Sequence, residues 1–209
     1  MKILDLFCGS KSIANVFKAK GHDVLTYDFD EQHNPDICDD IMNFDFYNIP
    51  EWKPDVIWAS PPCTTFSVAS IGCHWTGGKG AYIPKTIAAE KGLLILRKTE
   101  DIIRELNPRL WFMENPRGLM RKLTTMPGRR TVTYCAYGDS RMKPTDIFSN
   151  SNWIPRPMCH NGDPCHEAAP RGAKTGTQGI KGARDRSIIP IQLCQEILKV
   201  CEDYFNDQP

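Results

Sequence analysis

The N-terminal stretch Lys2-Ile3-Leu4-Asp5-Leu6-Phe7-Cys8-Gly9-Ser10 decides the fold. Its apolar part, residues 2–7, predicts a short buried strand, and residues 12–20 have helical spacing of apolar side chains up to Gly21, a helix stop. A strand, a glycine-containing turn and a helix in this order let backbone N–H groups approach a ligand at the edge of a sheet. The stretch lacks the three-glycine fingerprint of dinucleotide-binding proteins, which disfavours a nicotinamide cofactor.

The same alternation of strand and helix continues along the chain. Strands that alternate with helices indicate a mostly parallel sheet with crossover helices, so we predict an α/β fold and leave the strand order open. The supporting segments are predicted strands at 23–27, 55–59 and 110–113, a long helix at 86–106, a later hairpin at 131–137 and 146–148, and an amphipathic helix at 190–204.

Length and composition favour one domain over residues 1–209, since 209 residues with 41% hydrophobic content suit a single core. No run of eighteen apolar residues and no signal peptide is visible, so we expect a cytoplasmic protein, by default a monomer. The nine cysteines are odd in number and scattered, which favours reduced thiols over a disulfide framework.

Charge is distributed unevenly although the net charge is only +1. Residues 22–55 contain ten acidic residues and one lysine, whereas residues 117–130 contain five basic residues and no acidic one. This asymmetry favours an anionic partner on the later half of the chain. Two solvated faces whose charges merely balance would give the same pattern, so charge alone does not decide.

Polar and nucleophilic residues follow the predicted strands. Ser60-Pro61-Pro62-Cys63 comes after one buried strand and Glu114 ends the next, so a nucleophile and an acid are expected to meet at the carboxyl edge of the sheet. Asp28 follows the second strand, where an acidic side chain can bind ribose hydroxyls, and Asp40 could reach an adenine amino group. The alternative for both aspartates is capping of turns and helices.

Four motifs in order, Asp5-Leu6-Phe7-x-Gly9, Asp40-Ile41, Pro62-Cys63 and Glu114-Asn115, resemble the DNA cytosine-5 methyltransferase family, particularly its small phage-like members. The resemblance spans residues 1–150. It implies a Rossmann-like S-adenosylmethionine-dependent methyltransferase fold and a reaction at carbon 5 of cytosine in double-stranded DNA. It also implies that Cys63 attacks carbon 6 of a flipped cytosine and that Glu114 contacts the ring nitrogen at position 3.

The resemblance also implies a binding site for S-adenosylmethionine. Phe7 and Gly9 would line its methionine and adenine side, Asp28 would bind its ribose, and Asp40 with Ile41 its adenine. The neighbouring residues Cys8, Ser10, Phe29 and Pro61 complete the predicted cofactor-binding set.

One motif departs from the family. Where the family usually has Gln-x-Arg-x-Arg, this chain has Arg141-x-Lys143-x-Thr145. We predict that Arg141 and Lys143 belong to the catalytic site and contact phosphate or the cytosine carbonyl; the alternative is a pair of surface charges. Ser187, before the last helix, is a further candidate cofactor ligand.

The usual target-recognition domain of the family is reduced here to residues 151–186, a small loop-rich segment predicted to contact DNA. Cys159, His160, Cys165 and His166 could bind zinc, but their spacing is tighter than paired ligand motifs usually show, so we predict no metal. Candidate phosphate contacts are Arg117, Arg121, Lys122, Arg129 and Arg130, and in a basic, glycine-rich loop Arg171, Lys174, Lys181 and Arg184.

Three other functions fit the same residues. The family's tRNA-modifying branch uses the same cysteine chemistry, so RNA is an alternative substrate. The altered motif around Arg141 would also suit a catalytically silent nucleic-acid-binding module, although Cys63 and Glu114 are intact. Thiolate addition to carbon 6 would further serve an enzyme of free cytidine or deoxyuridine nucleotides, which the turn at residues 7–10 disfavours.

Overall fold

A computed structural model describes residues 1–45, 52–78, 81–167 and 183–207. The strands of its main sheet are β1 (Lys2–Leu6), β2 (Asp23–Asp28), β3 (Ile37–Cys38), β4 (Val56–Ala59), β7 (Leu110–Pro116), β8 (Arg130–Thr133) and β9 (Pro144–Ser149). The helices are α1 (Ser12–Ala19), α2 (Ile71–His74), α3 (Ile87–Leu106), α4 (Met120–Leu123), α5 (Ala183–Ser187) and α6 (Ile191–Asn206), with 3-10 turns η1 (Glu31–His33), η2 (Ile41–Asn43) and η4 (Tyr134–Tyr137).

The seven strands lie in the order β3-β2-β1-β4-β7-β9-β8. Strands β3, β2, β1, β4 and β7 pair in parallel, whereas β9 pairs antiparallel with both β7 and β8. The prediction of a mostly parallel sheet is therefore confirmed. The order reverses at β1 and β4, whose connections leave in opposite directions, and ligands of open α/β sheets bind at the carboxyl edge of such a switch point.

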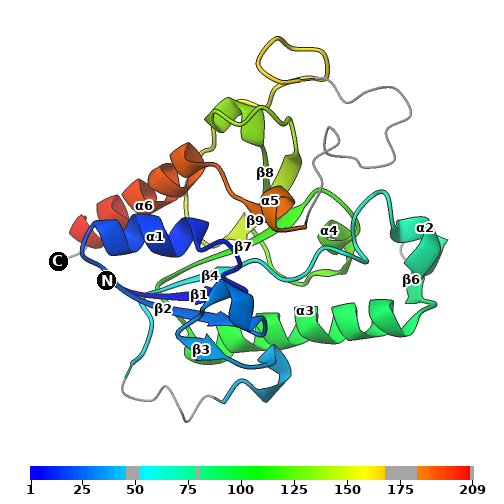
Figure 1. Ribbon diagram of the computed structural model, residues 1–209, viewed down its shortest axis with the longest axis horizontal. Helices are drawn as coiled ribbons and strands as arrows, with labels where there is room; N and C mark the ends of the chain where they lie inside the picture. Colours follow the sequence, from blue (N-terminus) through cyan, green and yellow to red (C-terminus); the bar gives the residue numbers. More distant parts are fainter. Residues whose placement is uncertain (46–51, 79–80, 168–182, 208–209) are drawn as a thin grey trace.

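Helices cover both faces of this sheet (Figure 1). Helices α1 and α6 lie together on one face, and α3 crosses the other. The central strands feed both layers because successive side chains point to opposite faces. In β4, for example, Val56 and Trp58 belong to the core beneath α1 and α6, and Ile57 and Ala59 to the core beneath α3. Apolar runs in these strands thus reflect burial on both sides.

Several elements differ from the sequence prediction. Residues Tyr134–Tyr137, expected to extend a hairpin strand, form the turn η4. Strand β3 and a two-stranded hairpin of β5 (Trp75–Gly78) and β6 (Ala81–Pro84) were not expected, since strands of two to four residues show little periodicity. Of the predicted basic loop, Arg171, Lys174 and Lys181 lie outside the described residues, and Arg184 is described only as part of α5. Within the described ranges, none of the helices has the length and apolarity needed to span a membrane.

The loop that follows β4 is held against the end of β7 by a close backbone approach at Gly118. Ser67 and Gly118 form an isolated antiparallel bridge, and Leu119 N–H donates to the Phe66 carbonyl at 2.7 Å. A Cβ atom at Gly118 would lie 2.2 Å from the Phe66 carbonyl oxygen. Only glycine therefore fits, and the position of the loop carrying Cys63 depends on it.

We expect Gly118→Ala to lower the free energy of unfolding by about 1–3 kcal/mol, because the added methyl group has to push two backbone segments apart. Chemical denaturation measures the change. Gly72→Ala is the matched control: a Cβ there has no neighbour within 4 Å and Gly72 lies in helix α2, so its stability should be unchanged or slightly higher. Equal stability of the two variants would contradict the close approach.

Candidate active site

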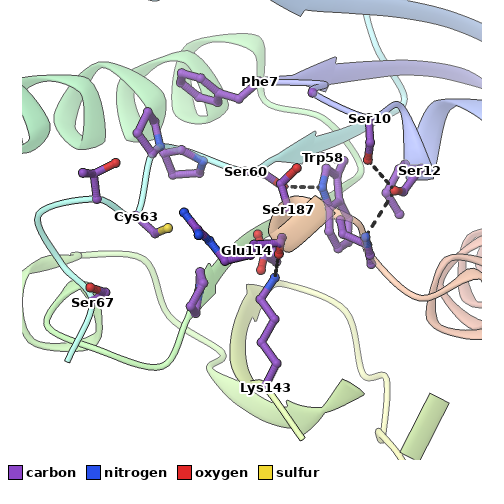
Figure 2. Close-up of a pocket in the computed structure, with 18 of the residues that line it drawn as sticks. Phe7, Ser10, Ser12, Trp58, Ser60, Cys63, Ser67, Glu114, Lys143 and Ser187 are labelled. Carbon is purple, nitrogen blue, oxygen red and sulfur yellow. Dashed lines mark hydrogen bonds between the residues drawn. The ribbon is translucent and has the colours of Figure 1, made fainter. Parts of the chain in front are cut away.

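A cavity of about 730 Å³ opens at the carboxyl edge of β1, β4 and β7. It is walled by the turn after β1, by the loop after β4 and by the end of β7, with Lys143 and Arg186 entering from the β9 side of the sheet. Figure 2 shows side chains from these separate segments converging on one space. Predicted residues that line it are Phe7, Cys8, Gly9, Ser10, Pro61, Cys63, Glu114, Lys143 and Ser187.

Cys63 lies in a tight turn of the loop that follows β4. Its carbonyl accepts hydrogen bonds from the N–H groups of Phe66 and Ser67, both at 3.0 Å, and its side chain is half-buried in the cavity wall. Burial raises the pKa of the Cys63 thiol and the charge of Glu114 adds to this, whereas Lys143 opposes it. The resting side chain is therefore a neutral thiol that faces the cavity.

Glu114 is the fifth of the seven residues of β7 and pairs with Ile147 of β9. The side chain is only 7% exposed, and burial raises the pKa of its carboxyl above the usual range, with Lys143 opposing this. The Tyr134 hydroxyl donates to Glu114 Oε1 at 3.2 Å. Burial therefore shifts Glu114 toward its protonated form, against the opposing effects of Lys143 and the Tyr134 hydrogen bond, and in that form it can donate a hydrogen bond to a ligand in the cavity.

The residue after Glu114 fixes the cysteine loop to the same strand. Asn115 Nδ2 donates to the Pro61 carbonyl at 2.8 Å, and both groups are buried. The Glu-Asn pair therefore contributes one side chain to the cavity and one to the loop that bears Cys63. This second contribution was not predicted from the sequence, because it depends on the parallel pairing of β4 and β7.

Lys143 enters the cavity, whereas Arg141 does not. Lys143 Nζ donates to the Arg186 carbonyl at 2.8 Å and lies 4.4 Å from the centre of the Tyr134 ring. The guanidinium of Arg141 is buried and pairs with Asp139, and it also donates to main-chain carbonyls of Asp185 and Ile188. This arrangement departs from the expectation for Arg141: its contacts tie the segment before α6 to the sheet instead of facing a ligand.

A second cavity, of about 170 Å³, adjoins the first, and Phe7 and Pro62 line both. The Asp28 carboxylate accepts a hydrogen bond from the Gly9 N–H at 2.9 Å, which stabilises the turn after β1. Asp40 caps η2 by accepting the Met42 N–H at 3.0 Å, which is the capping role considered as its alternative. The remaining predicted residues at this end, Asp28, Phe29, Asp40 and Ile41, line the second cavity.

The candidate phosphate contacts differ in their surroundings. Arg117 lines the larger cavity, and Lys122 and Arg129 are exposed. Arg121, however, donates from Nε to the buried carboxylate of Asp146 at 2.8 Å and stabilises the sheet edge. The run of basic residues is thus only partly available to an anionic partner.

Comparison with known proteins identifies the fold and chemistry that this geometry serves. Residues 1–127 match the family of C-5 cytosine-specific DNA methylases. A frog virus 3 (isolate Goorha) protein described as a "Probable DNA (cytosine-5)-methyltransferase" is 30% identical over 220 residues, which cover 96% of this chain and all of that protein. This chain belongs to the C-5 cytosine-specific DNA methylase family. Its sheet has the Rossmann-like methyltransferase fold, and its activity is that of a cytosine-5 methyltransferase.

Two solved structures support the fold at low sequence identity. A protein described as a DNA modification methyltransferase, encoded within an Escherichia coli prophage, superposes with a TM-score of 0.51 at 15% identity over 71% of this chain and 46% of that one. The Entamoeba histolytica methyltransferase EhMeth superposes with a TM-score of 0.52 at 10% identity over 71% of this chain and 52% of that one. The methylase chain described here spans about half the length of these two structures.

Three residues in or directly behind the cavity wall had no clear signal in the sequence of this methylase. Tyr134 reaches Glu114 from across the sheet, and Arg186 lies in a segment without periodicity. Asp5 was noted only within its motif, yet it is buried at the cavity wall, and its burial together with the charge of Asp28 raises its pKa to about 7. The position of Arg186 directly before Ser187 was the one available hint.

We expect Lys143→Gln to slow alkylation of Cys63 by iodoacetamide at pH 8, because loss of the cation raises the pKa of the thiol further. One pKa unit changes the thiolate fraction about tenfold, so a several-fold to roughly tenfold decrease is expected. Peptide mass spectrometry isolates the rate at Cys63 from the other cysteines. Lys143→Arg should retain most of the rate, and the exposed Lys122→Gln all of it; equal rates in the glutamine variants would refute the coupling.

We also expect Asp5 to make the unfolding free energy depend on pH. Its folded-state pKa, about 7, lies above its unfolded value of 3.8, so its contribution is complete below pH 3.8 and is lost as the pH rises through about 7. From pH 5 to pH 8 the wild type should lose on the order of 1–4 kcal/mol that Asp5→Asn does not lose. Urea denaturation at both pH values measures this. The exposed Asp203→Asn should behave as wild type, and an unchanged pH dependence in Asp5→Asn would contradict the assignment.

Proposed function

We propose that this protein transfers a methyl group from S-adenosylmethionine to carbon 5 of cytosine in double-stranded DNA, through a covalent adduct between Cys63 and a flipped base. One observation carries the proposal: a thiol and a buried, protonation-prone carboxyl line the same cavity, with the Lys143 ammonium lining it too. This is the set of groups needed to activate a cytosine ring, which is a poor nucleophile at carbon 5.

The chemistry follows from these groups. Cys63 loses its thiol proton to solvent and the thiolate forms a bond to carbon 6, and the electron pair displaced from the 5,6 double bond makes carbon 5 nucleophilic. Hydrogen bonding or proton donation by Glu114 at ring nitrogen 3 stabilises the charge that builds during addition, a contribution on the order of a hundredfold or more in rate. Transfer of the methyl group to carbon 5 would break its bond to the sulfonium sulfur and leave a neutral thioether. Loss of the carbon-5 proton to a base then re-forms the double bond and expels the Cys63 thiolate.

The two adjoining cavities fit the proposed methyl donor. S-adenosylmethionine supplies an electrophilic methyl group on a sulfonium sulfur. Phe7 lies between the two cavities, and Asp28 and Asp40 line the smaller one as acceptors for ribose hydroxyls and for an amino group. An elongated ligand with an apolar ring at one end and a charged centre at the other would thus span from the smaller cavity to Cys63.

Duplex DNA is the proposed substrate because the frog virus 3 relative, which aligns over its whole length, is described as acting on DNA. A target cytosine has to leave the base stack to reach Cys63, at a cost of a few kcal/mol. Arg117 at the cavity and the exposed Lys122 and Arg129 can offset this cost by phosphate contacts. We assign residues 151–186 as the reduced segment that contacts DNA beside the site.

The decisive experiment incubates the protein with S-adenosylmethionine carrying a tritiated methyl group and with duplex DNA, tRNA or free cytidine nucleotides. We expect label on cytosine in DNA and none above background with Cys63→Ala. Cys73→Ala, at an exposed cysteine outside both cavities, is the matched control and should retain full activity. Label on tRNA alone would replace DNA by RNA as substrate, and no label on any substrate would refute the proposal.

A second prediction concerns Glu114. We expect Glu114→Gln to lower the rate of methyl transfer at saturating DNA by about a hundredfold or more, since the amide cannot donate a proton, while the dissociation constant for DNA changes little. Single-turnover kinetics and DNA titration separate the two effects. Glu105→Gln, on the outer end of α3, should change neither. A weaker affinity for DNA with an unchanged rate of methyl transfer would contradict a catalytic role for Glu114.

A further inference from the structure

Three thiols gather at a point remote from the active site. The Sγ atoms of Cys135, Cys159 and Cys165 all lie within 4.8 Å of one another. Cys135 is buried in η4, Cys159 is half-buried and Cys165 is exposed in the segment that follows β9. None of the three lines either cavity described above, so the methyl-transfer chemistry does not account for them.

We propose that these three cysteines bind a structural zinc ion, with His166 as the fourth ligand. Zinc is bound tetrahedrally by thiolates at about 2.3 Å, which places the sulfurs of one site about 3.8 Å apart. The observed separations, all within 4.8 Å, need only small side-chain movements to reach that geometry. This replaces the sequence-based expectation of no metal, which rested on ligand spacing along the chain and could not include Cys135.

The two histidines of the segment have different surroundings. His160 has a side chain that is 91% exposed and faces Asp163, so it points away from the thiols. His166 has Nδ1 at 3.4 Å from Cys165 Sγ, and its Nε2 is buried with no hydrogen-bond partner among the described residues. Either nitrogen of a neutral imidazole can bind zinc. A rotation of the His166 ring toward the other two sulfurs would complete four ligands.

The segment that carries these ligands needs such an anchor. In residues 154–167 every side chain is exposed or only half-buried, whereas Trp153 before it and Ile189 after the undescribed part are buried. Its described contacts with the rest of the protein are polar. Cys159 N–H donates to Thr133 Oγ1 at 3.0 Å and Glu167 N–H to the Ser140 carbonyl at 2.9 Å, while Arg156 pairs with Glu196 and lies over the Tyr137 ring. Small segments without an apolar core are commonly stabilised by a metal.

The site links the proposed DNA-contacting segment to the main sheet. Cys135 belongs to η4, which directly follows β8, and the segment lies beyond the β8 edge of the molecule, where Figure 1 shows its gold-coloured trace at the top. A zinc ion bound there would fix residues 159–166 on the sheet edge. Zinc binding would order this segment. It requires three deprotonated thiols, and the metal stabilises these thiolates.

The test measures zinc in the full-length protein purified in reducing buffer without chelator. We expect about one zinc ion per chain by elemental analysis, and after exchange with Co²⁺ the sulfur-to-cobalt charge-transfer and intense visible bands of a tetrahedral thiolate site. Cys159→Ser should lose the metal, and Cys73→Ser, at an exposed cysteine of α2, should retain it. His166→Ala should bind zinc at least tenfold more weakly, and His160→Ala as tightly as wild type.

Two results would overturn the proposal. One is a wild-type protein with all nine thiols free and no bound zinc or cobalt spectrum, and the other is a disulfide between Cys159 and Cys165, seen by mass spectrometry without reductant. The cobalt spectrum of the wild type decides the matter even if Cys159→Ser does not fold. The metal content does not depend on methyl transfer: Cys63→Ala should keep its zinc, so this proposal and the proposed function can fail separately.

Discussion

The placement of β4 between β1 and β7 is the constraint on which the active site depends. Its register puts Ala59 beside both Leu6 and Met113, so the turn after β1, the loop after β4 and Glu114 end at the same level of the sheet. The three segments are far apart in the chain, and this strand pairing brings them to one edge. Burial on both faces of β4 holds this register, because a shift by one residue would exchange every side chain between the two cores.

The sequence predicted correctly that two candidate residues meet near the carboxyl ends of neighbouring buried strands. Cys63 and Glu114 were located in this way, and the motif order led to the family, because parallel strands bring their carboxyl ends to one edge whatever the strand order. The same reasoning failed where a contact joins segments that no local pattern relates. Tyr134 reaches Glu114 across the sheet, and Cys135 meets Cys159 only because η4 ends beside the later segment.

Arg141 shows a further limit of motif comparison. A basic residue in a motif where relatives have arginines looks catalytic in the sequence, but in the structure the Arg141 guanidinium donates to Asp139 and to main-chain carbonyls near α6. Of the two basic residues of this motif, the one that lines the cavity is Lys143, which has a positive φ. Side-chain direction in such a loop is set by partners more than forty residues away, so no pattern within the motif could have distinguished the two.

The protonation states of the cavity residues suit the binding of an uncharged cytosine before the proposed methyl transfer begins. Burial raises the pKa of Cys63 and of Glu114 alike, and Lys143 opposes both shifts. When the thiol and the carboxyl are both neutral, an uncharged cytosine can bind without leaving an unpaired charge buried away from water. In the proposed reaction the thiol loses a proton while the ring nitrogen gains one from Glu114, and Lys143 compensates the carboxylate that remains. Lys143 can thus stabilise first the Cys63 thiolate and later the Glu114 carboxylate, because the two groups are not fully charged at the same time.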